Sequence, residues 1–181
     1  MEKSEIEEGL IFSDVAAQLQ QRGFAIEQTD RTRPWGGFLT IRENQAERFA
    51  SVYFPDLDTT QLDHPGKLSP KMLLVAPHRR LSWQYHHHRA EIWQVVQGPV
   101  GVISSFNDVQ GVLKRVCVGE RIYLPQGMRH RLIGLQHWGV VAELWQHTDR
   151  TCPSNEEDIV RLQDDFARES IPTPSSSTRP P

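Results

Sequence analysis

The sequence predicts an all-β fold: a single jelly-roll barrel of two antiparallel sheets, with a short helix at its N-terminal and C-terminal ends. From Lys71 onward, short apolar stretches alternate with turn signals such as Gly98-Pro99 and Gly119, as is typical of antiparallel strands. Eight strand candidates follow one another at this spacing, at residues 72–76, 83–88, 91–97, 100–106, 112–118, 121–124, 130–135 and 140–146.

The chain before the barrel has helical spacing over residues 13–23. Ser13 is a plausible N-cap and Gly23 suits the C′ position. The elements expected between this helix and Lys71 are a strand over 24–28, a turn over 33–37, a strand over 38–42, a helical stretch over 45–53 and a polar loop over 56–66.

The end of the chain predicts a terminal helix over 154–168, because acidic residues fill its first turn and Ile159, Leu162 and Phe166 give it one apolar face. The tail is rich in Pro and Ser and is expected to be disordered. The predicted organisation is an N-terminal extension over 1–23, a barrel domain over 24–168 and a tail over 169–181.

The composition is that of an ordinary globular chain and excludes several classes of partner. The 181 residues are 24% charged and 38% hydrophobic, enough for one domain with a sizeable core. A net charge of −3 argues against a nucleic-acid partner, and no apolar stretch approaches the roughly 20 residues of a membrane span. The acidic start lacks a signal-peptide core, and Cys117 and Cys152 make no disulfide framework. We therefore expect a cytoplasmic protein.

Three consecutive histidines followed by a carboxylate stand in the middle of the chain. Side chains at i and i+2 of a strand share one face, so His86 and His88 are predicted to aim at one point while His87 faces away. A bend that begins at Arg89 would return Glu91 toward that point. Two imidazoles and a carboxylate suit a borderline divalent metal; the alternative is a solvated strand end.

A second stretch supplies another histidine. Its pattern G-x5-P-x-G-x2-H is matched at Gly119, Pro125, Gly127 and His130. Together the two stretches resemble the paired motifs of the cupin family, although Gly134 stands where the second motif usually closes on Asn. The resemblance implies a cupin barrel that holds one divalent metal ion, with Zn²⁺ favoured and Mn²⁺, Fe²⁺ or Ni²⁺ as alternatives.

The ligands implied by the cupin resemblance are His86, His88, Glu91 and His130. Only two residues separate His88 from Glu91, whereas most cupins have three or four at this point. His87 is therefore the alternative ligand in place of His86 or His88.

Five stretches resemble, more narrowly, the cupin domain of the type II mannose-6-phosphate isomerases. They are RPWG at 33–36, RLSWQYHHHRAEIW at 80–93, HRL at 130–132, ELW at 143–145 and EDIVRLQDDF at 157–166. The resemblance covers 33–41 and 67–168. The chain departs from the family in lacking a nucleotidyltransferase domain, in residues 43–66, which look like an insertion, and in its added N-terminal helix.

This resemblance implies an aldose–ketose isomerase that acts on a sugar phosphate through a metal-stabilised enediolate. A base is then needed besides the metal ligands. Glu143 lies in an apolar strand, where an inward carboxylate would be desolvated and its pKa raised; a partner for a nearby Arg is the equal alternative. Lys71 begins a strand where the family also places a lysine, so it would aid proton transfer or bind phosphate, unless it is a surface lysine.

A sugar phosphate needs cationic recognition, which a guanidinium group provides best. The arginines that flank the two motifs are Arg80, Arg89, Arg129 and Arg131, and one or two of them are expected to reach the phosphate. Gln84 shares the predicted inward face with His86, so it would bind a sugar hydroxyl or a metal-bound water. Tyr123 would do the same or simply pack.

Two other functions stay open at this point. A non-catalytic sugar- or sugar-phosphate-binding cupin is favoured if Glu143 and Lys71 face away from the metal. A metal-dependent cupin dioxygenase is favoured by a closed aromatic pocket, whose walls would be Trp83, Trp93 and Trp145. We expect a homodimer, because a small barrel exposes sheet edges that a partner's N-terminal segment can cover; the alternative is a helix folded on its own barrel.

Overall fold

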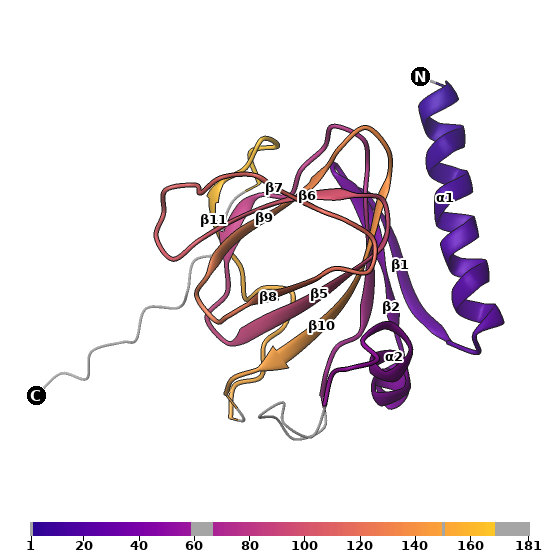
Figure 1. Ribbon diagram of the computed structural model, residues 1–181, viewed down its shortest axis with the longest axis horizontal. Coiled ribbons are helices and arrows are strands. Elements are labelled where there is room, and N and C mark those ends of the chain that lie inside the picture. The colour runs from indigo at the N-terminus through magenta and orange to yellow at the C-terminus, as the bar shows by residue number, and fades with distance from the viewer. Residues whose placement is uncertain (1, 59–66, 150, 169–181) are drawn as a thin grey trace, which may run out of the picture.

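The computed structural model describes residues 2–58, 67–149 and 151–168. Over these ranges the chain forms a barrel of two antiparallel sheets with α-helices beside it (Figure 1). The first sheet has the strand order β1-β2-β3-β10-β5-β8 and the second β11-β4-β9-β6-β7. The predicted all-β jelly-roll barrel is confirmed.

The elements follow the predicted order closely. The helices are α1 (Glu2–Gln21) and α2 (Ala46–Tyr53), the latter preceded by the 3-10 turn η1 (Glu43–Gln45). The strands are β1 (Ile26–Arg33), β2 (Gly36–Ile41), β3 (Lys71–Val75), β4 (Trp83–Tyr85), β5 (Arg89–Gln97), β6 (Val100–Ser105), β7 (Lys114–Val116), β8 (Arg121–Leu124), β9 (Arg129–Gly134), β10 (Gly139–His147) and β11 (Val160–Gln163). All eight strands predicted from Lys71 onward are present, as β3 to β10, and β4 and β7 are shorter than predicted.

The N-terminal helix is longer than predicted, and the assignment of Ser13 as its N-cap is wrong. Residues 2–12 contain no proline and are rich in Glu, Ile and Leu, so α1 begins well before Ser13. The Ser13 hydroxyl donates a hydrogen bond to the Gly9 carbonyl one turn back, at 2.8 Å. Gly23 follows the helix with a φ of 77°, a conformation that glycine adopts without strain.

The predicted C-terminal helix over 154–168 is wrong as well. This segment, which we name the strap, is extended and contains β11, which pairs antiparallel with β4. Local hydrogen bonds compete with a helix, because the Asn155 Oδ1 accepts the N–H groups of Glu157 at 2.8 Å and Asp158 at 3.2 Å. The open edge of β4 then offers backbone partners. The predicted disordered tail over 169–181 and most of the predicted loop over 56–66 lie outside the described residues.

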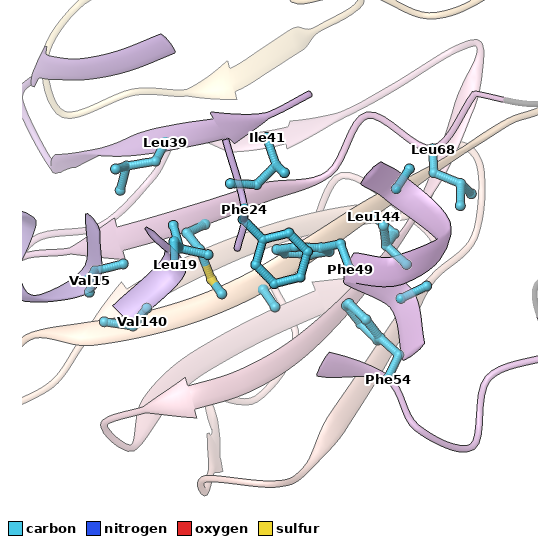
Figure 2. Close-up of a cluster of buried hydrophobic side chains, with 14 of the residues drawn as sticks. Val15, Leu19, Phe24, Leu39, Ile41, Phe49, Phe54, Leu68, Val140 and Leu144 are labelled. Carbon is cyan, nitrogen blue, oxygen red and sulfur yellow. The ribbon is translucent and has the colours of Figure 1, made fainter. Parts of the chain in front are cut away.

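The first sheet is buried on both faces along its central strands β2, β3, β10 and β5. Its outer face packs against α1 and α2, as Figures 1 and 2 show. The buried side chains that meet there include Val15, Leu19, Phe24, Leu39, Ile41, Phe49, Phe54, Val140 and Leu144. Burial of each large apolar side chain contributes about 1.5–3 kcal/mol. Neither helix within the described ranges has the length and apolar composition that a membrane crossing requires.

The inner face of the same sheet carries polar groups. In β10, Ala142 and Leu144 join the core under the helices, whereas Val141, Glu143 and Trp145 face the barrel interior. This is the alternation expected of a strand. The helices therefore cover the stabilising outer face, which leaves the inner face available for a site.

Phe49 is fully buried at the centre of the outer aromatic cluster, with its ring centroid 4.7 Å from that of Tyr53 and 5.6 Å from that of Phe24. Phe49→Ala should lower the free energy of unfolding by about 3–5 kcal/mol, because it leaves a cavity in this core. Urea titration followed by circular dichroism measures the change. Ile6→Ala, at a side chain that is 61% exposed, serves as the control and should stay within about 0.5 kcal/mol. Equal losses in both variants would contradict the assignment of this core.

Candidate functional site

Three buried side chains converge inside the barrel from three separate elements. His86 follows β4, Glu91 lies in β5 and His130 lies in β9, and each is at most 3% exposed. The His86 Nε2 lies 3.1 Å from one Glu91 carboxylate oxygen, and the His130 Nε2 lies 3.4 Å from the other. One ligand atom from each residue lies within 4.8 Å of the other two. Gln84 pairs with His130 across β4 and β9, and this pairing brings the two motifs together.

The hydrogen bonds of the two rings fix which nitrogen faces Glu91. The Nδ1 of His86 contacts the Asp158 carbonyl, and the Nδ1 of His130 lies 2.9 Å from the Met128 carbonyl. A carbonyl oxygen only accepts hydrogen bonds, so each Nδ1 carries a proton and each ring turns its Nε2 toward Glu91. Backbone carbonyls commonly orient metal-binding histidines in this way.

A lone pair that faces a carboxylate oxygen repels it, and a proton or a metal ion between the two removes that repulsion. The His130 Nε2 has no hydrogen-bond donor among the described residues, although the ring is buried. A divalent ion fits these donors, because neutral imidazoles and an ionised carboxylate are the ligands of Zn²⁺, Mn²⁺ and Fe²⁺ sites.

Arg89 supplies a cation on the other side of Glu91. Its Nε donates to the Glu91 carboxylate at 2.8 Å, and its Nη2 lies 3.2 Å from the His86 Nε2. Burial alone would raise the pKa of Glu91, but the adjacent His86 and the permanently charged Arg89 hold that pKa well below its ordinary value. Burial also lowers the pKa of His86. Glu91 is therefore ionised and His86 neutral, the protonation states that metal binding needs.

The structure does not bring the predicted ligand His88 into this group. Strand β4 ends at Tyr85 and the chain bends at His87 and His88, before the predicted bend at Arg89, so the alternation that paired His86 with His88 stops there. The Asp158 carboxylate holds the bend by accepting both backbone N–H groups, at 2.8 and 3.0 Å. The alternative ligand His87 is exposed and also lies outside the group.

A cavity of about 90 Å³ adjoins Glu91, and Glu143 and Lys71 both line it. Glu143 accepts a hydrogen bond from the Trp93 Nε1 at 2.9 Å. Burial, and then the charge of Glu91, raise the pKa of Glu143 to about 7. Such a carboxyl can both accept and return a proton near neutral pH.

Lys71 stands opposite Glu143 in the pairing of β3 with β10. The side chain is buried, and its Nζ lies 3.6 Å from the centre of the Trp145 ring and pairs with Glu156 of the strap. Lys71 thus lies between Glu143, on the wall of the cavity, and the strap.

The residues predicted to bind substrate separate into two groups. Gln84 and Arg89 line the cavity, and Gln84 accepts a hydrogen bond from the Ser82 hydroxyl at 2.6 Å. The other predicted residues do not line the cavity. Arg80 pairs with Asp165 on the surface, and Arg129 pairs with Asp108. The buried Arg131 donates to the Gln163 carbonyl, and Tyr123 is exposed beside Arg121.

Sequence reasoning missed three further arginines that line the cavity, Arg33, Arg161 and Arg168. Arg33 and Arg161 belong to the RPWG and EDIVRLQDDF stretches, so those stretches were the available signal. Their side chains converge only because β11 folds back onto β4. Of the predicted aromatic walls, Trp93 and Trp145 line the cavity, whereas Trp83 donates to the Asp108 carbonyl.

Comparison with known proteins identifies the family of the chain. Residues 41–164 match the family described as "Mannose-6-phosphate isomerase C-terminal". The chain is 29% identical over 128 residues to a mannose-1-phosphate guanylyltransferase of Salmonella montevideo, which covers 70% of this chain and 26% of that protein. It is 30% identical over 129 residues to the alginate biosynthesis protein AlgA of Pseudomonas aeruginosa, which covers 71% of this chain and 25% of that protein. The chain thus spans about a quarter of the length of these relatives.

Among solved structures, the capsular polysaccharide assembling protein CapF from Staphylococcus aureus superposes with a TM-score of 0.51 at 15% identity, over 76% of this chain and 32% of that one. At this identity the likeness concerns the fold alone. The family match covers more than half of the chain, so the protein belongs to the family of mannose-6-phosphate isomerase C-terminal domains, built as a cupin barrel.

Proposed function

We propose that the protein is a metal-dependent sugar-phosphate isomerase that interconverts an aldose and a ketose, with a hexose phosphate of the mannose-6-phosphate type as substrate. One observation carries the proposal: Glu143, a carboxyl group with a pKa of about 7, lines the same cavity as Glu91 of the convergent histidine–carboxylate group. Isomerisation needs such a base beside a centre that stabilises negative charge.

His86, Glu91 and His130 would hold the metal ion, Zn²⁺ or alternatively Mn²⁺, Fe²⁺ or Ni²⁺. The bound ion would act as a Lewis acid toward neighbouring hydroxyl and carbonyl oxygens of the sugar. His88 stays a predicted fourth ligand only if the bend that contains it rearranges.

Glu143 would perform the proton transfer. Its ionised carboxylate takes the proton from C2 of the aldose and returns it to C1, and a hydroxyl proton moves between the two neighbouring oxygens. The Trp93 N–H holds one carboxylate oxygen, which leaves the other for the substrate. The positive charge of Lys71 favours the ionised base, and the Gln84 amide, whose oxygen is held by Ser82, would bind a hydroxyl.

The relatives support a phosphorylated sugar as the substrate. Their names refer to mannose-1-phosphate guanylyltransferases and to alginate biosynthesis. Those activities belong to proteins about four times as long as the matched segment. The names therefore favour only a class of substrate, a phosphorylated sugar. The reaction is inferred from the residues of the site.

A non-catalytic sugar-phosphate-binding cupin is the second candidate, and one observation favours it. Arg89 already donates to Glu91 and contacts His86, so a built-in cation satisfies part of the group that would bind metal. The positions of Glu143 and Lys71, which both face the cavity, argue against a non-catalytic protein. A dioxygenase is less favoured, because charged side chains such as Arg33 and Arg161 stand beside the aromatic walls.

We also propose a homodimer, formed through the second sheet. Helix α1 covers its own barrel, with Phe12, Val15 and Leu19 buried, so we place the interface at another sheet edge. Strand β7 is the last strand of its sheet, and the loop before it exposes Phe106 and Val112. A second copy can pair along this edge and bury these apolar side chains.

His130→Ala should reduce the metal content of the purified protein from about one ion per chain to a small fraction of that, because it removes one of three donors. Inductively coupled plasma mass spectrometry after dialysis measures the metal, and circular dichroism checks the fold. His87→Ala, at an exposed ring outside the group, is the matched control and should keep its metal. Full metal content in His130→Ala would contradict the proposed centre.

Glu143→Gln should lower the isomerase rate about 10²- to 10⁴-fold while the protein keeps its metal, since Gln can still accept the Trp93 hydrogen bond. In the parent protein kcat/KM should rise with pH and level off above about 7, because the base works only when deprotonated. A coupled assay with hexose and heptose phosphates from pH 5 to 9 measures both effects. Glu120→Gln, at an exposed carboxylate, is the control. An unchanged rate in Glu143→Gln would exclude this base.

Light scattering at micromolar concentration should give twice the chain mass of 20.8 kDa. The double variant Phe106→Asp, Val112→Asp should give the mass of a single chain, because it places charges on the proposed interface. A single-chain mass for the parent protein would reject the dimer, and a dimeric double variant would reject this surface.

A further inference from the structure

Three arginines from different parts of the chain gather at the cavity. Arg33 ends β1, Arg161 lies in β11 and Arg168 lies at the end of the strap. All three line the same cavity as Glu91 and Glu143. One wall of the cavity is therefore the barrel and the opposite wall is the strap, with guanidinium groups on both.

The three guanidinium groups are close enough to repel one another. Burial lowers the pKa of Arg161, and the neighbouring charges of Arg168 and Arg33 lower it further, whereas Asp164 acts in the opposite direction. Gathering like charges in a partly buried place costs free energy. An anion bound between them would recover that cost.

The nearby carboxylates leave donor groups available. Asp30 accepts from the Arg33 Nε at 2.9 Å, and Asp164 accepts from the Nε and Nη2 of Arg168, both at 2.8 Å. Both Nη groups of Arg33 and the Nη1 of Arg168 make no hydrogen bond to other described residues. Planar guanidinium groups with free N–H pairs are the preferred partners of phosphate oxygens.

We propose that Arg33, Arg161 and Arg168 form the binding site for the phosphate group of the substrate, and that a bound phosphate fastens the strap to the barrel. The inference rests on the proposed function for the identity of the ligand as a sugar phosphate. The phosphate end of the molecule would lie between barrel and strap, and its carbon chain would extend toward Glu143 and Glu91.

The small size of the cavity suggests a role for the strap in ligand binding. A volume of about 90 Å³ is well below the roughly 300–1,000 Å³ of sites for small molecules, so we expect the strap to shift outward when a sugar phosphate enters. Arg161 and Arg168 move with it while Arg33 stays on the barrel. The anion site is complete only when the strap returns.

The strap also holds the metal-binding group in place. Ser154 Oγ and the Asn155 carbonyl accept hydrogen bonds from Arg89 at 2.8 and 3.0 Å, and the Asp158 carbonyl contacts the His86 ring. A phosphate that fastens the strap therefore also favours the arrangement of Arg89 and His86 described above. Substrates without a phosphate would lack this effect.

The test is a titration of the full-length protein with inorganic phosphate by isothermal calorimetry. Arg33→Gln and Arg161→Gln should each weaken binding about tenfold or more, because each removes a charge-assisted contact. Arg31→Gln is the matched control, since it removes the same charge at a residue that pairs with Glu8 of α1, away from both the strap and the cavity. Arg161→Lys should recover part of the affinity. Absence of phosphate binding, or equal losses in Arg31→Gln and Arg161→Gln, would overturn the proposal.

A second measurement separates this proposal from the proposed function. Hydrogen exchange at the amides of β11 should slow when phosphate is added to the parent protein and should not change in Arg161→Gln. Slowed exchange without isomerase activity would leave the anion site standing and reject the enzyme. Isomerase activity with an unchanged KM in Arg33→Gln and Arg161→Gln would support the enzyme and reject the anion site.

Discussion

The ion pair between Arg89 and Glu91 is the interaction on which the interior of the barrel depends. A carboxylate removed from water costs several kcal/mol unless a cation and hydrogen-bond donors replace the water. Arg89 provides both, at 2.8 Å, and stacks on the Trp145 ring at 3.7 Å. Arg89 is itself buried and needs acceptors for its remaining N–H groups, and the strap supplies them from Ser154, Asn155 and Asp158. The charge on Glu91 thus explains why a segment without helical structure is held against the barrel.

The two faces of the first sheet differ in composition, and this difference explains how such a polar interior is tolerated. The outer face buries its apolar residues under α1 and α2. The inner face mixes apolar residues such as Val141 with Glu143 and Lys71. Burial in this interior, and then the charge of Glu91, raise the pKa of Glu143. In β10, residues of the helix-covered core therefore alternate with residues that face the cavity.

The features that the sequence predicts well are local. Strand positions follow from alternation and turn residues, and the convergence of His86, Glu91 and His130 follows from two compact motifs. His88 lies outside this group because the bend beside it is held by Asp158, some 70 residues away along the chain. The helix expected in the strap failed for the same kind of reason, since the partner of β11 is the distant edge of β4.

The arginines at the cavity show the same limit. Arg80 and Arg131 flank the motifs in the sequence but lie outside the cavity, whereas Arg33 and Arg161 reach it from the two ends of the chain. No local pattern brings residues 33 and 161 together. Only the pairing of strands does so, and that pairing depends on the whole barrel.

The central position of β10 has a consequence for the order in which the protein forms. This strand lies between β3 and β5, yet about 60 residues separate the end of β3 at Val75 from Gly139. At a synthesis rate of roughly 5–20 residues per second, β3 waits on the order of 3 to 12 s for its partner. During that time its open edge and the apolar side chains of Met72 and Leu74 lack their final contacts. The early helices α1 and α2, which pack on this part of the sheet, are available to shield them while the nascent chain is still growing.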